Sequence, residues 1–307
     1  MSNGSSSVPV RRVMRAHAKI NLLLRILARE ASGLHSIETV FQKLALHDVV
    51  HVATNASGRL LSCDGPAMPS GGIGAQEDNI AWRAAVAFTD ATQWDTGWEI
   101  AIEKHIPVGG GLGGGSADGA AVLRALNALC PHPLDHAALI ALGGTLGADM
   151  TFFVSEARLA LAWGRGDRLL TLTPLPQMAV TLVAFLTGVH TGQAYAALAR
   201  SRVEGASQTG AFPYAAGSYA SDAFASWENV SAVAANDFEA IVPAMHTGVA
   251  ATLPLVRAAA QRVRDSGAPG IGMMSGSGAT CFVVHPNGID VTLDVGQTAR
   301  VVRTETV

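Results

Sequence analysis

Six glycines fall within the seven residues 109–115, and only Leu112 interrupts them. Before this run, residues 97–103 alternate large apolar side chains with polar or small ones, which is the period-2 pattern of a half-buried strand. After it, apolar residues within 122–129 recur at helical spacing. The sequence therefore predicts a strand, a glycine loop and a helix in that order.

A glycine loop that leads into a helix is suited to binding phosphate. Glycine lets backbone N–H groups approach a ligand closely, and the helix start adds unpaired N–H donors and a positive dipole end. Ser116 and Asp118 fall in the first turn of the predicted helix. One or two glycines would be explained by a flexible turn or a close helix contact, but six in seven residues favour a phosphate loop.

The composition describes a folded globular protein. Hydrophobic residues make up 49% of the chain and charged residues 15%, as in a folded protein. A length of 307 residues is enough for two domains of ordinary size. The net charge of −3 argues against a basic nucleic-acid binder. Three widely separated cysteines without a CxxC pair suggest neither a disulfide framework nor a cysteine zinc site, and they fit a reducing cytoplasm. We expect a soluble protein without a membrane span, since no apolar run approaches ~18 residues.

Local patterns predict alternating strands and helices along the chain. Strands are expected at residues 12–26, 37–46, 49–52, 97–103, 157–163, 178–185 and 280–284. Helices are expected from residues 77–79 to 91, after the glycine loop to 129, from 135 to 142, from about 191, and over 236–248 and 250–266. Turns or loops are expected at 31–36, 164–167 and 205–221, loops or a hairpin at 54–74, and a glycine-rich hairpin turn at 270–279. A domain break is expected near 174–176.

Two polar positions have both a functional and an ordinary interpretation. In an extended strand, Lys19 and Asn21 would share one face, which is either a solvated face or part of a site. Asp149 lies among glycine, alanine and apolar residues, where an unpaired carboxylate is costly. It is either a helix cap or a catalytic carboxylate.

The spacing around the glycines tests two familiar phosphate loops. A P-loop, GxxxxGK[ST], needs a lysine that reaches the terminal phosphates, and no lysine follows Lys104. The dinucleotide fingerprint GxGxxG is matched by Gly109, Gly111 and Gly114, as is almost unavoidable in a glycine run. It also requires an acid after the next strand, whereas Asp135 follows two prolines at a predicted helix start. The dinucleotide interpretation therefore ranks second.

Residues 107–118 resemble the phosphate loop of the GHMP small-molecule kinases, usually written PxxxGLGSSAA. Further segments occur in the order found in one branch of that family, which phosphorylates a cytidine-diphosphate-linked methylerythritol in the non-mevalonate isoprenoid route. These segments are Ala18-Lys19-Ile20-Asn21-Leu22, Gly33-Leu34-His35, Glu77-Asp78-Asn79, Gly147-Ala148-Asp149, Gly164-Arg165-Gly166-Asp167, Asn236-Asp237-Phe238-Glu239 and Ser275-Gly276-Ser277-Gly278-Ala279. The resemblance covers nearly the whole chain.

The resemblance implies a two-domain α/β (α+β) GHMP kinase fold. Residues 1–172 would form a ribosomal-protein-S5-like N-terminal domain and residues 173–307 a ferredoxin-like C-terminal domain, with the active site in the cleft between them. It also implies a cytoplasmic enzyme that moves the γ-phosphoryl of ATP to an acceptor hydroxyl and forms a 2-phosphate. Mg²⁺ would be carried with the nucleotide, with no metal site on the protein, and the enzyme would be a monomer or homodimer.

The resemblance also implies roles for individual residues. The catalytic pair would be Lys19 and Asp149. The nucleotide-binding residues would be Asn79, Lys104, Pro107, Gly109, Gly110, Gly111, Leu112, Gly113, Gly114, Gly115 and Ser116, and the acceptor-binding residues Asn21, His35 and Tyr195. Two departures stand out. Leu34 replaces a tyrosine that stacks on cytosine in relatives, and Met150-Thr151 replaces the Val-Pro that follows the aspartate in relatives.

Three other functions remain as alternatives. Leu34 keeps open a GHMP kinase for another small alcohol, such as homoserine or mevalonate, although His35, Asn79 and residues 236–239 oppose it. A catalytically inactive nucleotide-binding regulator is disfavoured because Lys19 and Asp149 are both present. A dinucleotide-dependent oxidoreductase would bind NAD.

Overall fold

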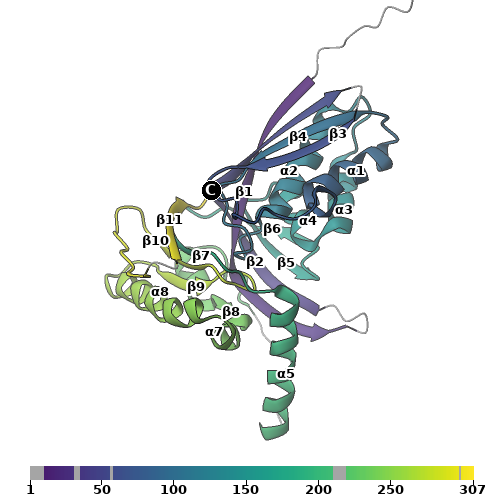
Figure 1. Ribbon diagram of the computed structural model, residues 1–307. Coiled ribbons are helices and arrows are strands. Elements are labelled where there is room, and N and C mark those ends of the chain that lie inside the picture. The colour runs from purple at the N-terminus through teal and green to yellow at the C-terminus, as the bar shows by residue number, and fades with distance from the viewer. Residues whose placement is uncertain (1–9, 31–34, 56–57, 210–218, 297–298) are drawn as a thin grey trace, which may run out of the picture. The chain divides into compact units, whose positions relative to one another are not determined.

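The computed structural model describes residues 10–30, 35–55, 58–209, 219–296 and 299–307 (Figure 1). The chain forms two compact units. Unit 1 comprises Met1–His17, His47–Ile106 and Gly114–Glu156, and unit 2 comprises Ala18–Leu46, Pro107–Gly113 and Ala157–Val307. Two long strands, β1 (Val10–Arg29) and β2 (His35–Asn55), contribute residues to both. The units interleave along the chain, and the expected domain boundary between residues 172 and 173 stays a prediction.

The sheet of unit 1 is built on β4 (Gly97–Glu103). This strand pairs antiparallel with β2 on one side and parallel with β3 (Arg59–Asp64) on the other. Trp98, Ile100 and Ile102 are buried while the residues between them are more exposed. The predicted half-buried strand before the glycine loop is confirmed.

Among its described residues, unit 1 also contains four α-helices and one short 3₁₀ helix. They are η1 (Gln76–Asp78), α1 (Ile80–Thr92), α2 (Gly114–Leu129), α3 (His136–Leu146) and α4 (Ala148–Ser155). Asn79 caps α1 by accepting a hydrogen bond from the backbone N–H of Ala81 (2.9 Å). Asp135 caps α3 in the same way, accepting from Ala138 (2.8 Å). The helix start predicted at Asp135 is confirmed. The helix predicted to open at residues 77–79 begins only at Ile80, because residues 76–78 form the separate 3₁₀ helix η1.

Unit 2 contains two sets of strands. In the first, β5 (Leu159–Gly164) pairs with β2 and with β6 (Arg168–Thr171), and β8 (Ala235–Asn236) pairs parallel with β1. The second is an antiparallel four-stranded sheet in the order β11 (Ala299–Glu305), β7 (Ala179–Phe185), β10 (Cys281–His285) and β9 (Ile271–Met274).

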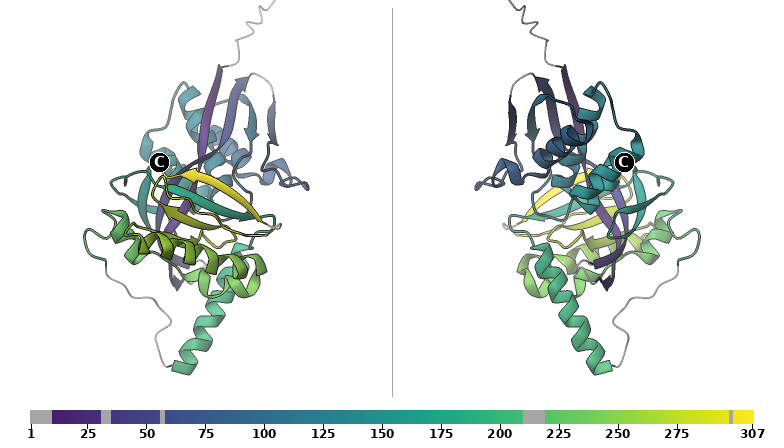
Figure 2. Two further views of the ribbon diagram at one scale, coloured as in Figure 1. Left: turned by 90° about the vertical axis from the view of Figure 1, so that its left-hand side faces the viewer. Right: turned by 90° about the vertical axis from the view of Figure 1, so that its right-hand side faces the viewer.

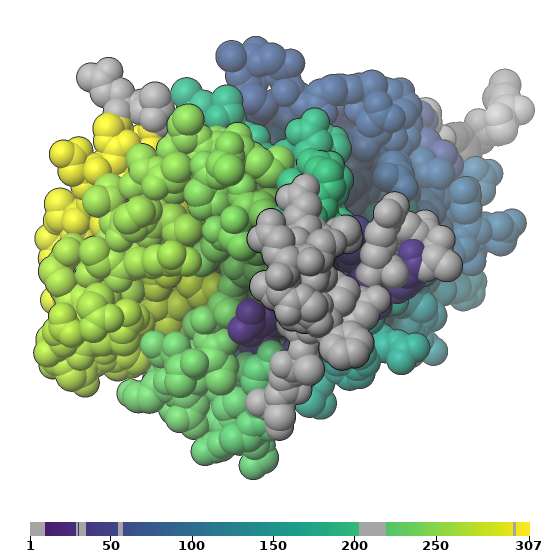
Figure 3. All heavy atoms as spheres, turned by 90° about the horizontal axis from the view of Figure 1, so that it is seen from below, coloured from purple at the N-terminus to yellow at the C-terminus, as the bar shows by residue number. Residues whose placement is uncertain are grey.

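The helices of unit 2 are α5 (Thr191–Thr209), α6 (Trp227–Val233), η2 (Asp237–Ala240), α7 (Val242–Met245) and α8 (Thr247–Asp265). α8 lies against β9 and β10 on one face of the four-stranded sheet (Figure 2). It buries Val249, Leu253, Val256, Ala260 and Val263, which recur at helical spacing, and its opposite face forms part of the surface (Figure 3). Among the described residues, no helix is long and apolar enough to cross a membrane.

Several predicted boundaries differ from the structure. The expected strands 37–46 and 49–52 form the single strand β2, and the expected loop 54–74 contains β3, which is held by its pairing with β4. The segment 236–248 is not one helix, because the Asn236 side chain accepts from the Phe238 N–H and starts the separate turn η2. Most of the turn expected at 31–36 and the centre of the loop expected at 205–221, residues 210–218, lie outside the described residues.

Candidate active site

The backbone of the glycine loop, residues 109–115, includes positive φ angles that residues other than glycine adopt only at a cost in free energy. Gly109, Gly111 and Gly113 have φ angles of +75°, +77° and +74°. A Cβ on Gly110 would lie 2.5 Å from the Thr280 hydroxyl oxygen, and one on Gly111 would collide with the carbonyl oxygen of Ser275. The loop is therefore made of glycine both for its conformation and for its close packing.

The second glycine-rich segment, residues 275–279, contacts the first within unit 2. It joins β9 to β10, as expected for the hairpin predicted at 270–279. The Ser275 hydroxyl donates to the carbonyl of Gly111 (2.9 Å), and the Thr280 N–H donates to the carbonyl of Gly110 (3.1 Å). These bonds hold the glycine loop from one side.

Lys19 holds the same loop from β1. Its Nζ donates to the carbonyl of Gly111 (3.0 Å) and to Oδ1 of Asn21 (2.7 Å), and its backbone N–H donates to the carbonyl of Leu112 (2.9 Å). The Asn21 amide in turn donates to the Thr39 hydroxyl (2.7 Å). Lys19 is 4% exposed and Asn21 2%. The two residues share a face as predicted, but the interpretation of that face as solvated is wrong.

The loop leads directly into α2, which begins at Gly114. The first backbone N–H groups of a helix have no intrahelical acceptor, so they point toward the preceding loop with the positive end of the helix dipole. Ser116 lies in this first turn and is partly exposed, whereas Ala117 is buried. The predicted order of strand, glycine loop and helix is confirmed.

Asp149 lies in the first turn of α4 and is half-buried. The N-cap of that helix is Gly147, which makes no side-chain capping bond, so the interpretation of Asp149 as a cap is wrong. Thr151, which stands where relatives have proline, donates its hydroxyl to the carbonyl of Ala148 (2.7 Å). The hydrogen bond from Thr151 to Ala148 thus restrains the first turn of α4, where relatives have the proline.

The two aromatic residues predicted to bind the acceptor lie together in unit 2. The rings of His35 and Tyr195 are stacked, with centroids 4.4 Å apart and planes 19° apart. The edge of Tyr195 also meets Phe238, at 4.9 Å and 82°. Leu34, which stands where relatives have a tyrosine that stacks on cytosine, lies outside the described residues.

Lys104 belongs to a buried ionic cluster in unit 1. Its Nζ forms ion pairs with Asp48 and with Asp118 (2.6 Å), and Asp48 also accepts the backbone N–H groups of His105 (2.5 Å) and Ile106 (2.7 Å). Lys104 is 3% exposed. Its predicted contact with the nucleotide stays a prediction, as does that of Asn79, whose amide donates to the Cys63 sulfur (3.8 Å).

Sequence reasoning missed this cluster. The expectation that Asp118 lies in the first turn of its helix is also wrong, because α2 begins at Gly114 and has no acid in its first turn. Burial raises the pKa of Asp118 to about 7, Lys104 opposes the rise, and Asp48 adds to it. Burial lowers the pKa of Lys104, but Asp118 and Asp48 outweigh it, so the net pKa is raised. Lys104 therefore stays charged, and Asp118 is the carboxylate that takes up a proton near neutral pH.

Asp118→Asn is expected to change how stability depends on pH. The pKa is about 7 in the folded protein and 3.8 ordinarily. The stability contributed by protonated Asp118 is therefore present below pH 3.8 and lost as the pH rises through about 7. Asparagine stays neutral, so the variant should gain stability relative to the parent as the pH rises from 3.8 through about 7. Urea unfolding measures this, with Asp90→Asn on the exposed face of α1 as control. A difference independent of pH would contradict it.

Known proteins resemble this chain along most of its length. The family model "GHMP kinases N terminal domain" matches residues 79–156. A protein of Pelobacter propionicus named 4-diphosphocytidyl-2-C-methyl-D-erythritol kinase is 34% identical over 270 residues, covering 88% of each chain. This chain belongs to the 4-diphosphocytidyl-2-C-methyl-D-erythritol kinase family. A crystal structure of a kinase with the equivalent name is 30% identical, with a TM-score of 0.64 over 89% of this chain and 90% of that one.

More distant structures share the fold of this kinase family. A homoserine kinase from Cytophaga hutchinsonii is 15% identical, with a TM-score of 0.60 over 100% of this chain and 97% of that chain. At that identity the likeness shows the fold alone. The predicted mixed α/β GHMP kinase fold and the predicted kinase class are both confirmed. Membership of a kinase family implies ATP as co-substrate.

Proposed function

We propose that this chain transfers the γ-phosphoryl of ATP to a hydroxyl of 4-diphosphocytidyl-2-C-methyl-D-erythritol, forming its 2-phosphate. The observation that carries the proposal is the contact of Lys19 Nζ with the carbonyl of Gly111, which places a buried ammonium on a glycine loop. Phosphoryl transfer depends mainly on positioning and on stabilising negative charge, and such an arrangement serves both. The substrate itself is inferred from the names of the relatives.

The phosphate loop, residues 109–116, fits the phosphates of ATP. Positive φ angles recur at every second residue from Gly109 to Gly113, and Gly110 and Gly111 have no room for a Cβ. The loop would therefore bind phosphate through its backbone N–H groups. The N-terminus of α2 adds further donors. Mg²⁺ bound to the nucleotide would neutralise phosphate charge. The Ser116 hydroxyl is an oxygen ligand of the kind that Mg²⁺ prefers.

Lys19 and Asp149 would carry the chemistry. Lys19 would offset charge on the transferred phosphoryl, and Asn21 and the Gly111 carbonyl fix where its ammonium lies. Asp149 would orient the acceptor hydroxyl and receive its proton.

His35, Tyr195 and Asn21 would bind the acceptor. The stacked rings of His35 and Tyr195 provide an aromatic surface and a ring nitrogen that can recognise a base edge. The Asn21 amide group has two N–H donors, of which one is bonded to Thr39, and the other would donate to a substrate oxygen.

An acceptor panel tests the proposal. ADP release would be measured with ATP and, separately, the cytidylyl substrate, homoserine and mevalonate. We expect kcat/KM to be at least about a hundredfold higher for the cytidylyl substrate, since a site built to hydrogen-bond a group rejects acceptors that lack it. Turnover with only homoserine or mevalonate would contradict the proposal. ATP binding without turnover of any acceptor would instead support a nucleotide-binding regulator.

A further inference from the structure

The segment Asn236–Glu239, called here the clamp, holds three parts of unit 2. Asn236 donates its amide to the carbonyls of Met274 (2.7 Å) and Gly276 (2.9 Å). The Glu239 carboxylate accepts from the backbone N–H of Met274 (2.7 Å). These two residues therefore secure the second glycine-rich segment. The two residues between them make different contacts.

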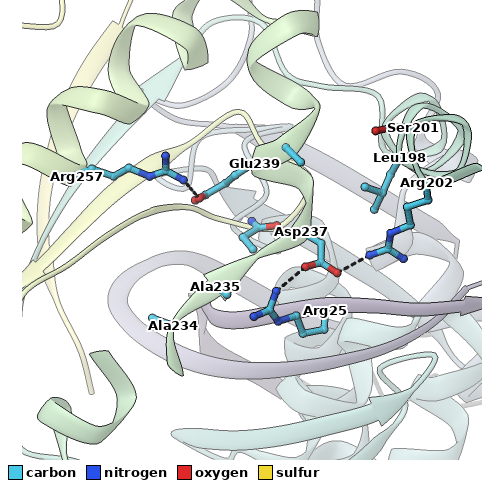
Figure 4. A pocket seen from close by; sticks show the side chains of 11 residues that line it. Arg25, Leu198, Ser201, Arg202, Ala234, Ala235, Asp237, Glu239 and Arg257 are labelled. Carbon is cyan, nitrogen blue, oxygen red and sulfur yellow. Dashed lines mark hydrogen bonds and ion pairs between the residues drawn. The ribbon is translucent and has the colours of Figure 1, made fainter. Parts of the chain in front are cut away.

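Asp237 joins α5 to the end of β1. Its Oδ1 accepts from the Arg25 guanidinium (2.9 Å), and its Oδ2 accepts from the Ile26 N–H (2.8 Å) and the Arg202 guanidinium (2.7 Å). Figure 4 shows the carboxylate between the two arginines, which come from β1 and α5. The Asp237 side chain is 10% exposed, so these bonds are largely shielded from water. Charge-assisted bonds of this kind are stronger than neutral ones.

Arg202 lies on the same face of α5 as Tyr195. The residues Tyr195, Leu198 and Arg202 are spaced i, i+3 and i+7, and Leu198 between the other two is buried. Phe238, the neighbour of Asp237 in the clamp, is 1% exposed and meets the edge of Tyr195. Adjacent clamp residues thus contact α5 at two points about two helical turns apart.

Ionic contacts supplement the apolar packing of α5, in which Leu198 is buried. A pocket of about 570 Å³ opens beside Asp237 (Figure 4). Its lining residues are Arg25, Leu198, Ser201, Arg202, Ala234, Ala235, Asn236, Asp237, Glu239, Ala240 and Arg257. Several are small, which leaves the space between the clamp and α5 unfilled. Arg202 crosses this level by donating to Asp237 (2.7 Å) and to the carbonyl of Ile26 (2.5 Å), and the first of these bonds is an ion pair.

We propose that Asp237 is a positioning residue for the acceptor, which through Arg202 holds α5 so that Tyr195 stays stacked on His35. The inference rests on the proposed function, in which His35 and Tyr195 bind the acceptor. In this role Asp237 affects the affinity for the acceptor and has little effect on the affinity for the nucleotide, because the Asp237 carboxylate bonds to the end of β1 and to α5. Asn236 and Glu239 support the glycine-rich segment instead.

Steady-state kinetics of Asp237→Asn and Arg202→Gln test this role. We expect the KM of the cytidylyl acceptor to rise about tenfold in each variant, while the KM of ATP and kcat stay within about twofold, because one charge-assisted contact of α5 is lost. Asp290→Asn is the matched control, since Asp290 also pairs with an arginine of unit 2, Arg303, but is exposed. Arg202 is more exposed than Asp237, so its variant still provides the test if Asp237→Asn fails to fold.

The same substitutions in a Tyr195→Leu background show whether the effect passes through Tyr195. If it does, Asp237→Asn should raise the acceptor KM much less in that background than in the parent. Full additivity in the double variant, or an unchanged acceptor KM in both single variants, would overturn the inference. A parent enzyme that turns over no cytidylyl acceptor would instead overturn the proposed function on which the inference rests.

Discussion

Asp149→Asn is expected to lower kcat by roughly 10²–10⁴-fold while leaving the Kd of ATP nearly unchanged. The amide keeps the size of the side chain in the first turn of α4 but cannot receive the hydroxyl proton. Since the nucleotide would bind to backbone groups of the phosphate loop, binding should persist. ADP release with saturating acceptor and an ATP-analogue titration measure the two quantities separately.

Asp135→Asn is the matched control for this experiment. Asp135 is also an acid at the start of a helix of unit 1, where it caps α3. Asparagine is as good a cap, so both stability and kcat should stay close to those of the parent. An unchanged kcat in Asp149→Asn would remove Asp149 from the mechanism.

Gly111→Ala is expected to damage the phosphate loop severely. Its φ of +77° costs an L-residue about 1–2 kcal/mol. In addition, the new Cβ would collide with the Ser275 carbonyl oxygen and lie 3.1 Å from that of Gly278. The Gly111 carbonyl, which binds Lys19 and Ser275, would have to move. We expect kcat/KM for ATP to fall by at least about a hundredfold, since small misplacements at a reacting centre cost that much.

Gly109→Ala separates strain from collision. Gly109 has nearly the same φ, +75°, but a Cβ there would meet nothing within 4 Å among the described residues. We expect this variant to lose about 1–2 kcal/mol of stability and much less activity than Gly111→Ala. Equal losses of activity in the two variants would show that the contact with the 275–279 segment is unimportant.

Features of the fold that depend on neighbouring residues were predictable from the sequence. The alternation in β4, the glycine loop and the helix starts at Asn79 and Asp135 each have a signal within a few residues. The shared face of Lys19 and Asn21 followed from strand geometry alone. The burial of that face did not, because it depends on which distant segments cover it.

Features that depend on distant partners were not predictable in this way. Lys104 and Asp48 are 56 residues apart, and Asp237 and Arg25 are 212 apart. Nothing in the sequence near either residue indicates its partner. The parallel pairing of β3 with β4 and the strand β11 at the edge of its sheet were missed for the same reason.

Phosphorus-31 NMR of the product tests the central claim most directly. The full chain would be incubated with ATP, Mg²⁺ and 4-diphosphocytidyl-2-C-methyl-D-erythritol. The account predicts one new phosphomonoester signal on the acceptor, an intact cytidine diphosphate linkage, and ADP in equal amount. Consumption of ATP to ADP and inorganic phosphate without a monoester would contradict it, as would a monoester formed only when homoserine or mevalonate replaces the cytidylyl substrate.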